Sequence, residues 1–273
     1  MTQWRVAFPM YVLPQMQADM RSLWIMVKTR LTMDGVENLP DEPEFSDPLA
    51  QGHVPQDLLM LQYCGYPYVT QWQESKQLTP FACLHYDAPH CEGKLHRSVI
   101  VVAEQSKIKK LSKLKNSRVA INGYDSNTGM NLLRHTIAPI AKSTQFFSQV
   151  TVTGAHAASA QAVADGSADV AAIDCVTFAY LSDYDAALTA QLRVIATTET
   201  SPALPLFVAS HVPQDIQQKL YTAWQEVMDN RNQYAATLKR LRMQGIEPIT
   251  NADLDVIAKY EAQAAQMGYP ELI

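Results

Sequence analysis

Three consecutive repeats of an apolar run, a polar turn and a helical segment constrain the fold of this chain more than any other feature. The apolar runs lie at residues 118–121, 149–152 and 169–173, and each is followed closely by a segment with helical spacing. Strands joined through helices in this way run parallel, because the helix carries the chain back along the sheet before the next strand begins. We therefore predict a parallel sheet covered by helices.

The rest of the chain contains further strands and a helical tail. Apolar or alternating runs predict strands near residues 4–8, 58–64, 81–86, 98–103 and 193–196. Apolar spacing predicts a helix at about 15–33, whereas residues 36–56 contain four prolines and predict a loop. After Pro213, three helices are expected, of which the second reaches about Met243.

This order of elements predicts an α/β protein with two lobes. Lobe 1 is expected to comprise residues 1–100 and 200–273, including the helical tail, and lobe 2 residues 101–199. Each lobe is expected to hold a mostly parallel sheet flanked by helices. Two extended crossings, near residues 98–103 and 201–206, would form a hinge between them.

Charge and hydropathy exclude several classes of function. The 273 residues carry a formal net charge of −5, which gives no electrostatic reason to bind nucleic acid. No apolar run approaches the roughly 18–20 residues of a membrane span. Met1 leads directly into a strand without an export leader, so the chain is expected to be cytoplasmic if Met1 is native.

The four cysteines are too few for a disulfide scaffold in a chain of this size. Cys64 and Cys175 lie in apolar runs and are expected to be buried thiols. Cys83 and Cys91 are eight residues apart around a turn that contains proline. They are candidates for a disulfide in an oxidising compartment and remain free thiols otherwise.

The turns of the three repeats are the candidate binding site. Each follows the carboxyl end of a strand, where open α/β sheets bind ligands, and each begins a helix, whose free amides attract anions. In the first turn, Ser126, Asn127 and Thr128 add polar groups, and Gly129 permits close approach of a ligand. The alternative is that Asp125 or Ser126 only caps its own helix.

The second and third turns carry titratable side chains. His156 begins a helix with Ser159 on the same face, and the alternative is a surface histidine. Asp174 repels an anion. It is therefore expected to cap its own helix, to orient His156, or to accept a proton from a ligand hydroxyl or ammonium group.

Other chemistries fit the sequence less well. Ser126, His156 and Asp174 superficially suggest a hydrolytic triad, but all three are expected at helix starts, without a strained nucleophile turn. Metal-capable residues crowd into one short segment, but their spacing matches no standard zinc site, and we predict neither a metal nor a cofactor. This set comprises Cys83, His85, Asp87, His90 and Cys91.

Several segments together resemble the phosphonate and phosphate substrate-binding proteins of ABC transporters, the PhnD-like type. The resemblance covers about residues 4–210 in the same order. It rests on Gln62–Tyr68, 97–102, 125–129, 153–159, 169–174 and 201–205. It implies a type II periplasmic-binding-protein fold that closes over its ligand by hinge bending, and a periplasmic location.

The resemblance also implies roles for particular residues. An oxyanion would be held by Ser126, Asn127, Thr128 and His156, with Asp174 beside them. Tyr11 and Tyr66 would line the site from the other lobe. With the neighbouring turn residues, the full ligand-binding set is Tyr11, Tyr66, Ser126, Asn127, Thr128, Gly129, His156, Ser159, Asp174 and Thr177. An ABC-transporter permease is the expected protein partner.

Two other classes of function stay open from the sequence. One is a cytosolic enzyme, a lyase or hydrolase on a small carboxylated or phosphorylated metabolite, with His156 or Asp174 as acid or base. The other is a ligand-sensing module for a signalling partner. The primary expectation is a non-catalytic binder of a small phosphonate or phosphate.

Overall fold

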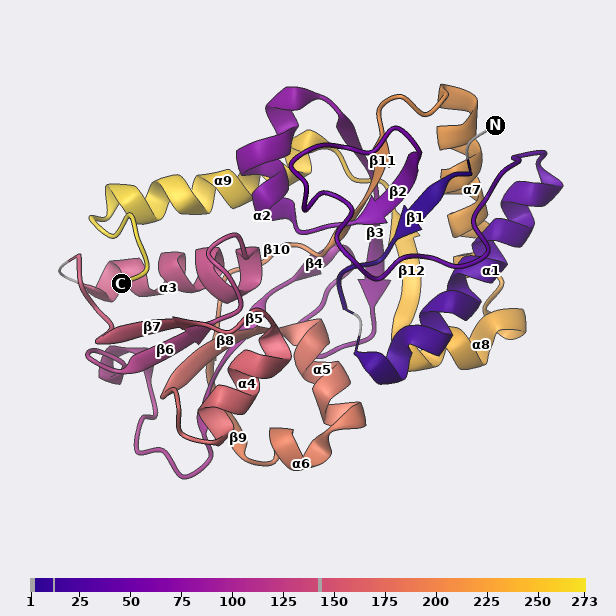
Figure 1. The fold of residues 1–273 in the computed structure, drawn as a ribbon. Coiled ribbons are helices and arrows are strands. Elements are labelled where there is room, and N and C mark those ends of the chain that lie inside the picture. Colours follow the sequence, from indigo (N-terminus) through magenta and orange to yellow (C-terminus); the bar gives the residue numbers. More distant parts are fainter. Residues whose placement is uncertain (1–2, 12, 142–143) are drawn as a thin grey trace. The chain divides into compact units, whose positions relative to one another are not determined.

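The computed structural model describes residues 3–11, 13–141 and 144–273, and it divides the chain into two compact α/β units (Figure 1). Unit 1 comprises Met1–Asp87, Glu92–Lys94 and Pro202–Asp253. Unit 2 comprises Ala88–Cys91, Leu95–Ser201 and Leu254–Ile273. The fold is therefore the two-lobed α/β fold that the sequence predicts.

Unit 1 is built on a five-stranded mixed sheet. Its order is β1 (Arg5–Ala7), β2 (Leu58–Gln62), β11 (Pro205–Ala209), β3 (Leu78–Tyr86) and β12 (Met243–Glu247). All five residues of β2 are buried, which explains its nearly continuous apolar sequence. β1 pairs with β2 in parallel, whereas β11 runs antiparallel to both β2 and β3.

The helices of unit 1 bury large side chains against one another and against this sheet. The long helices are α1 (Gln17–Met33), α7 (Gln214–Asp229) and α8 (Arg231–Arg240). Trp24 of α1 and Trp224 of α7 are completely buried, and Trp224 packs edge-on against Phe8. Short helical turns complete the unit: η1 (Pro14–Met16), α2 (Gly65–Pro67), η2 (Tyr68–Trp72) and η3 (Gln73–Ser75).

Unit 2 contains a second five-stranded sheet. Its order is β7 (Gln149–Val152), β6 (Arg118–Ile121), β8 (Val170–Asp174), β5 (Ser98–Ala103) and β9 (Leu192–Thr197). β6 pairs in parallel with β7 and with β8, as the three repeats predict. The carboxyl ends of these three strands therefore meet at one edge of the sheet, where the candidate turns begin.

Helices cover both faces of this second sheet. In Figure 1, α3 (Leu132–Ala141) lies on one face and α4 (His156–Ala164) on the other. The remaining elements are η4 (Leu111–Lys113), η5 (Asn127–Asn131), α5 (Cys175–Tyr184), α6 (Ala186–Thr189) and α9 (Asn251–Gln266). Two short strands, β4 (Leu95–His96) and β10 (Ser201–Pro202), form a separate ladder.

The expectation of mostly parallel sheets is wrong in detail. In unit 2, β5 runs antiparallel to β8 and to β9. In unit 1, β11 and β12 pair with β3 antiparallel. Only strands joined through a helix within one unit must run parallel. Among the strands of the two five-stranded sheets, β3 of unit 1 precedes β5 and β9 of unit 2 precedes β11, so no helix within the unit sets their direction.

The helical tail belongs to unit 2 from Leu254 onward, whereas the sequence placed it in lobe 1. Asn131 donates a hydrogen bond to the Ile257 carbonyl, and the Phe146 amide donates to the Ile273 carbonyl. The sequence analysis also missed β12, because the helical pattern reaching Met243 conceals the strand that begins there. Within the described ranges, every helix is too short or too polar to cross a lipid bilayer.

Candidate functional site

Three turns of unit 2 begin where β6, β7 and β8 end, and polar side chains link the first two. Thr128 in η5 and His156 at the first position of α4 approach within 2.9 Å, between the Thr128 Oγ1 and His156 Nε2 atoms. The Ser98 hydroxyl donates to the Thr128 carbonyl at 2.7 Å, which fixes η5 against β5. The first and second turns are thus joined directly through side chains.

The first turn is held mainly by its own hydrogen bonds. Ser126 is an N-cap, and its hydroxyl accepts a hydrogen bond from the Gly129 amide at 2.9 Å. Asn127 donates to the Ser201 hydroxyl at 2.8 Å and accepts from Asn131 at 3.1 Å. The alternative that Ser126 caps its own helix is therefore confirmed. Asn127 connects the first turn to Ser201 and Asn131, both within unit 2.

Gly129 is needed for packing inside the protein. A Cβ atom at this position would meet the Asn122 side-chain oxygen at 1.8 Å and the Ser126 hydroxyl at 3.1 Å. Any side chain would therefore force the start of η5 away from β6. The requirement for glycine here is explained without a ligand.

We expect Ser126→Ala to lower the free energy of unfolding by about 1 kcal/mol, because it removes the cap of the first turn. Denaturant unfolding monitored by circular dichroism measures this effect. A loss of phosphonate binding with no change in stability would show instead that the hydroxyl serves the ligand.

The third turn contains a buried ion pair. The Asp174 Oδ2 atom lies 2.9 Å from His96 Nδ1, and both side chains are almost completely buried. The Asp174 Oδ1 atom accepts hydrogen bonds from the amides of Val176 and Thr177, at 2.9 and 3.1 Å. Both oxygens of Asp174 are therefore engaged within the protein, and the expectation that it caps its own helix is confirmed.

The protein environment shifts the pKa values of His96, Asp174 and His156. Burial opposes charge on His96 and on Asp174, but their mutual attraction prevails, so the pKa of His96 is raised and that of Asp174 is lowered. Burial lowers the pKa of His156, and the charge of Asp174 and the Ala172 carbonyl oppose this shift only partly. The shifts therefore favour the charged forms of His96 and Asp174 and the neutral form of His156.

The ion pair predicts a pH dependence of stability. The pKa of His96 is raised above its ordinary value of 6.5 on folding. Its stabilising effect is therefore complete below pH 6.5 and is lost as the pH rises through the raised pKa. The pKa of Asp174 is lowered from 3.8, so its effect is present above pH 3.8 and is lost as the pH falls through the lowered value.

His96→Gln is therefore expected to remove most of the decline in melting temperature above pH 6.5. Below pH 6.5 the lowered pKa of His156 costs stability as that residue is protonated, so the role of His96 is judged from the alkaline limb alone. Melting curves between pH 5 and pH 9 measure this. An unchanged alkaline slope in the variant would contradict the role of His96.

The helix starts differ in whether their amides are free to bind an anion. At α5, the Cys175 amide donates to the Arg97 carbonyl, and the next two amides donate to Asp174. Among the described residues, none accepts a hydrogen bond from the amides of Thr128, His156 and Ala157. Two of the three turns thus present free donors, whereas Asp174 closes the third.

The other predicted ligand residues occupy varied positions. Ser159 is completely buried, and its hydroxyl lies 2.6 Å from that of Thr153, which braces the second turn. Thr177 is half-buried in the first turn of α5. Tyr11 and Tyr66 belong to unit 1, where Tyr11 contacts Tyr86 edge-on at 5.3 Å and Tyr66 is buried in α2. The role of both tyrosines toward a ligand stays a prediction.

The candidate disulfide between Cys83 and Cys91 is not formed, and all four cysteines are free. The Cys83 thiol is buried in unit 1 against the carbonyls of Lys94 and Ala203. Cys91 belongs to unit 2, where its sulfur atom lies 3.4 Å from that of Cys175. The two thiols that lie together are therefore those of Cys91 and Cys175, and not the pair predicted from its short spacing in the sequence. Within the described residues, no three metal-capable side chains converge.

Sequence reasoning missed His96 as a functional candidate. It lies two residues before β5 in the short strand β4, and only the fold brings it to Asp174, 78 residues later in the numbering. Ser98 and Ser201 were predicted to begin the two extended crossings and were part of the family resemblance, but their contacts to the first turn were not predicted. A polar residue in a buried strand is the signal that could have identified Ser98.

Comparison with known proteins decides the family. The sequence profile of the periplasmic substrate-binding proteins of phosphonate ABC transporters matches residues 40–254, which is most of the chain. The chain belongs to this family. No curated protein matches it by sequence.

Solved structures of low sequence identity share the fold. The binding-protein component of a phosphonate ABC transporter from Pseudomonas aeruginosa has a TM-score of 0.78 and 16% identity, over 97% of this chain and 87% of that one. PhnD1 from Prochlorococcus marinus, in complex with methylphosphonate, has a TM-score of 0.76 and 14% identity, over 97% and 99%. The aliphatic sulphonate-binding protein SsuA from Escherichia coli has a TM-score of 0.61 and 17% identity, over 97% and 86%. This substrate-binding protein thus has the two-lobed fold of type II periplasmic binding proteins.

Proposed function

We propose that this substrate-binding protein binds a small tetrahedral oxyanion of the phosphonate or phosphate class, without altering it chemically, at the first two turns of unit 2. The observation that carries the proposal is the hydrogen bond between Thr128 and His156 at 2.9 Å. It places two helix starts with free amides beside each other, together with a hydroxyl and an imidazole. Tetrahedral oxyanions suit such a set, because their several oxygens accept hydrogen bonds from different directions.

The energetics of this arrangement are adequate without a lysine or arginine. Hydrogen bonds to a charged group contribute about 1.5–3 kcal/mol each, and a micromolar complex needs about 8 kcal/mol. When His156 donates to the Thr128 oxygen, the Thr128 hydroxyl and the amides of Thr128, His156 and Ala157 supply four donors. These can reach micromolar affinity when the site excludes water, which we propose happens by hinge closure between the lobes.

Asp174 has a supporting role in this proposal. Both of its oxygens are occupied by His96 and by the start of α5, which leaves it poorly placed to select a ligand ammonium group. Its pairing with His96 also accounts for the shifted pKa values of both groups without invoking catalysis. The pair instead holds α5 and β4 around the turns. Export to the periplasm and delivery to an ABC-transporter permease are further parts of the proposal, supported by family membership.

A thermal-shift series tests the proposed ligand class. The panel is phosphate, phosphite, methylphosphonate, 2-aminoethylphosphonate, sulfate and an alkanesulfonate. At 100 times its Kd, a ligand adds about 2.7 kcal/mol of stability, and at least one phosphorus oxyanion should do so. A panel that leaves the melting temperature unchanged would contradict the proposal. Recovery of a chemically altered ligand, seen by ³¹P NMR, would favour the enzyme alternative.

A further inference from the structure

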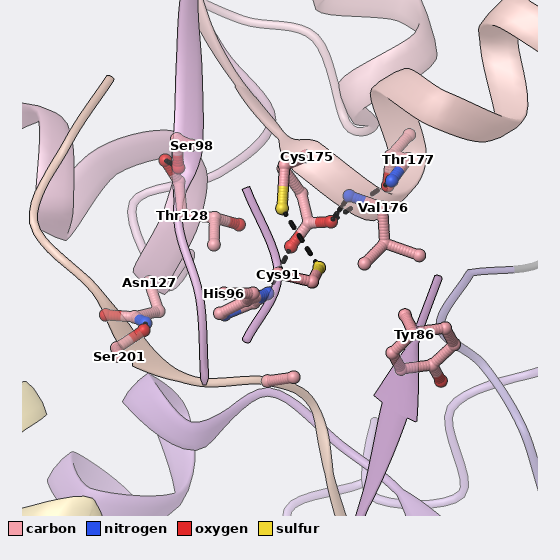
Figure 2. Close-up of polar contacts among 12 residues, drawn as sticks. Tyr86, Cys91, His96, Ser98, Asn127, Thr128, Cys175, Val176, Thr177 and Ser201 are labelled. Carbon is pink, nitrogen blue, oxygen red and sulfur yellow. Dashed lines mark hydrogen bonds and ion pairs between the residues drawn. The ribbon is translucent and has the colours of Figure 1, made fainter. Parts of the chain in front are cut away.

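Two thiols that the proposed function does not use lie against each other in unit 2. The Sγ atoms of Cys91 and Cys175 are 3.4 Å apart, although the residues are 84 positions apart in the chain (Figure 2). A disulfide bond requires about 2.05 Å between the sulfur atoms. The two side chains therefore need to approach by little more than 1 Å, a movement within the range of ordinary side-chain adjustment.

The two thiols differ in accessibility. Cys91 is half-buried in the short segment before β4, whereas Cys175 is 2% exposed at the first position of α5. Its hydrogen bond to Cys91, then burial and the charge of Asp174, raise the pKa of Cys175, so this thiol stays protonated. A soluble oxidant therefore meets the Cys91 sulfur first, with Cys175 positioned behind it as the resolving thiol.

We propose that Cys91 and Cys175 are a site of reversible covalent modification, at which a small-molecule disulfide such as oxidised glutathione produces an intramolecular disulfide. The Cys91 thiolate attacks one sulfur of the oxidant, displaces one thiolate and forms a mixed disulfide. Cys175 then attacks the Cys91 sulfur, and its proton passes to the second leaving thiolate. Two cysteine thiols are oxidised to one disulfide while the oxidant is reduced to two thiols.

The position of this pair gives the disulfide a structural consequence. Ala88–Cys91 is a short piece of unit 2 that lies in sequence between two segments of unit 1, just before the chain crosses into unit 2 again at Leu95. Cys175 directly follows Asp174, which caps α5 and pairs with His96. The disulfide fixes this connecting piece to the start of α5. This inference does not depend on which ligand the protein binds.

Peptide mapping of the full chain tests the proposal. After incubation with oxidised glutathione and alkylation, we expect a cross-linked peptide pair containing Cys91 and Cys175 that a reducing agent separates. The same linkage should form in a Cys64→Ser, Cys83→Ser double variant, which retains only these two thiols. Closing so long a loop should also raise the melting temperature by about 5 °C or more.

The controls separate this pair from nonspecific oxidation. Cys91→Ser and Cys175→Ser should each abolish the cross-link and the rise in melting temperature. A glutathione adduct that persists on Cys91, a linkage that includes Cys64 or Cys83, or full alkylation of Cys91 after oxidation would overturn the proposal. Because mapping of the unsubstituted chain is sufficient, poor folding of a variant does not prevent the test.

Discussion

Asp174→Ala is expected to lower the free energy of unfolding by about 3–5 kcal/mol, the largest effect of any single substitution in the candidate site. The substitution leaves His96 buried with its partner removed, and a buried charge without a partner is costly. It also removes the cap of α5, whose first amides lose their acceptor. Denaturant unfolding at pH 6, monitored by circular dichroism, measures the loss where the ion pair is fully formed.

Asp185→Ala is the matched control for this substitution. Asp185 also caps a helix, because its carboxylate accepts from the Leu188 amide at 3.1 Å, but its side chain is exposed and pairs with no cation in the described structure. Its loss should cost about 1 kcal/mol. Equal effects of the two substitutions would show that capping, and not the buried pair with His96, accounts for the contribution of Asp174.

His156→Ala is expected to weaken binding of methylphosphonate by about 10- to 100-fold, because it removes the imidazole that orients the Thr128 hydroxyl toward the charged ligand. The melting temperature of the ligand-free chain should fall only slightly, since His156 is half-buried and lies at the end of a helix. Isothermal titration calorimetry measures the affinity, and circular dichroism measures the melting temperature.

His135→Ala provides the control for His156. His135 is also half-buried in unit 2, but it belongs to α3 and hydrogen-bonds to Gln263 of α9. Its loss should leave methylphosphonate affinity unchanged. If both histidine variants bind as tightly as the unsubstituted chain, the second turn is not part of the binding site. If both lose binding together with stability, the effect is one of folding.

The repeating part of the fold was accessible from sequence because its pattern is local. The strands β6 and β7 end at the predicted residues, and β8 is displaced by only one. The pairing of strands that lie far apart in the chain could not be predicted from the sequence. Nothing in the apolar run at 98–103 specifies that β5 pairs antiparallel with β8 and β9, since a buried strand has the same composition in either direction.

The candidate site was predicted in part, for a related reason. Turn residues are positioned by their own strand and helix, so Ser126, His156 and Asp174 could be found from the repeats. The groups that hold these turns come from elsewhere in the chain: His96 of β4 pairs with Asp174, and Ser201 of β10 accepts a hydrogen bond from Asn127. Without these partners, the sequence could not distinguish a carboxylate that faces a ligand from one that is already paired.

Amide chemical-shift mapping with methylphosphonate tests the central claim most directly. In ¹⁵N-labelled protein, the account predicts that the largest shifts on titration occur at the amides of the first two turns, Thr128, His156 and Ala157. The amides of Val176 and Thr177, which already donate to Asp174, should move much less. Saturable shifts concentrated outside unit 2, or shifts at α5 that exceed those at the first two turns, would contradict it.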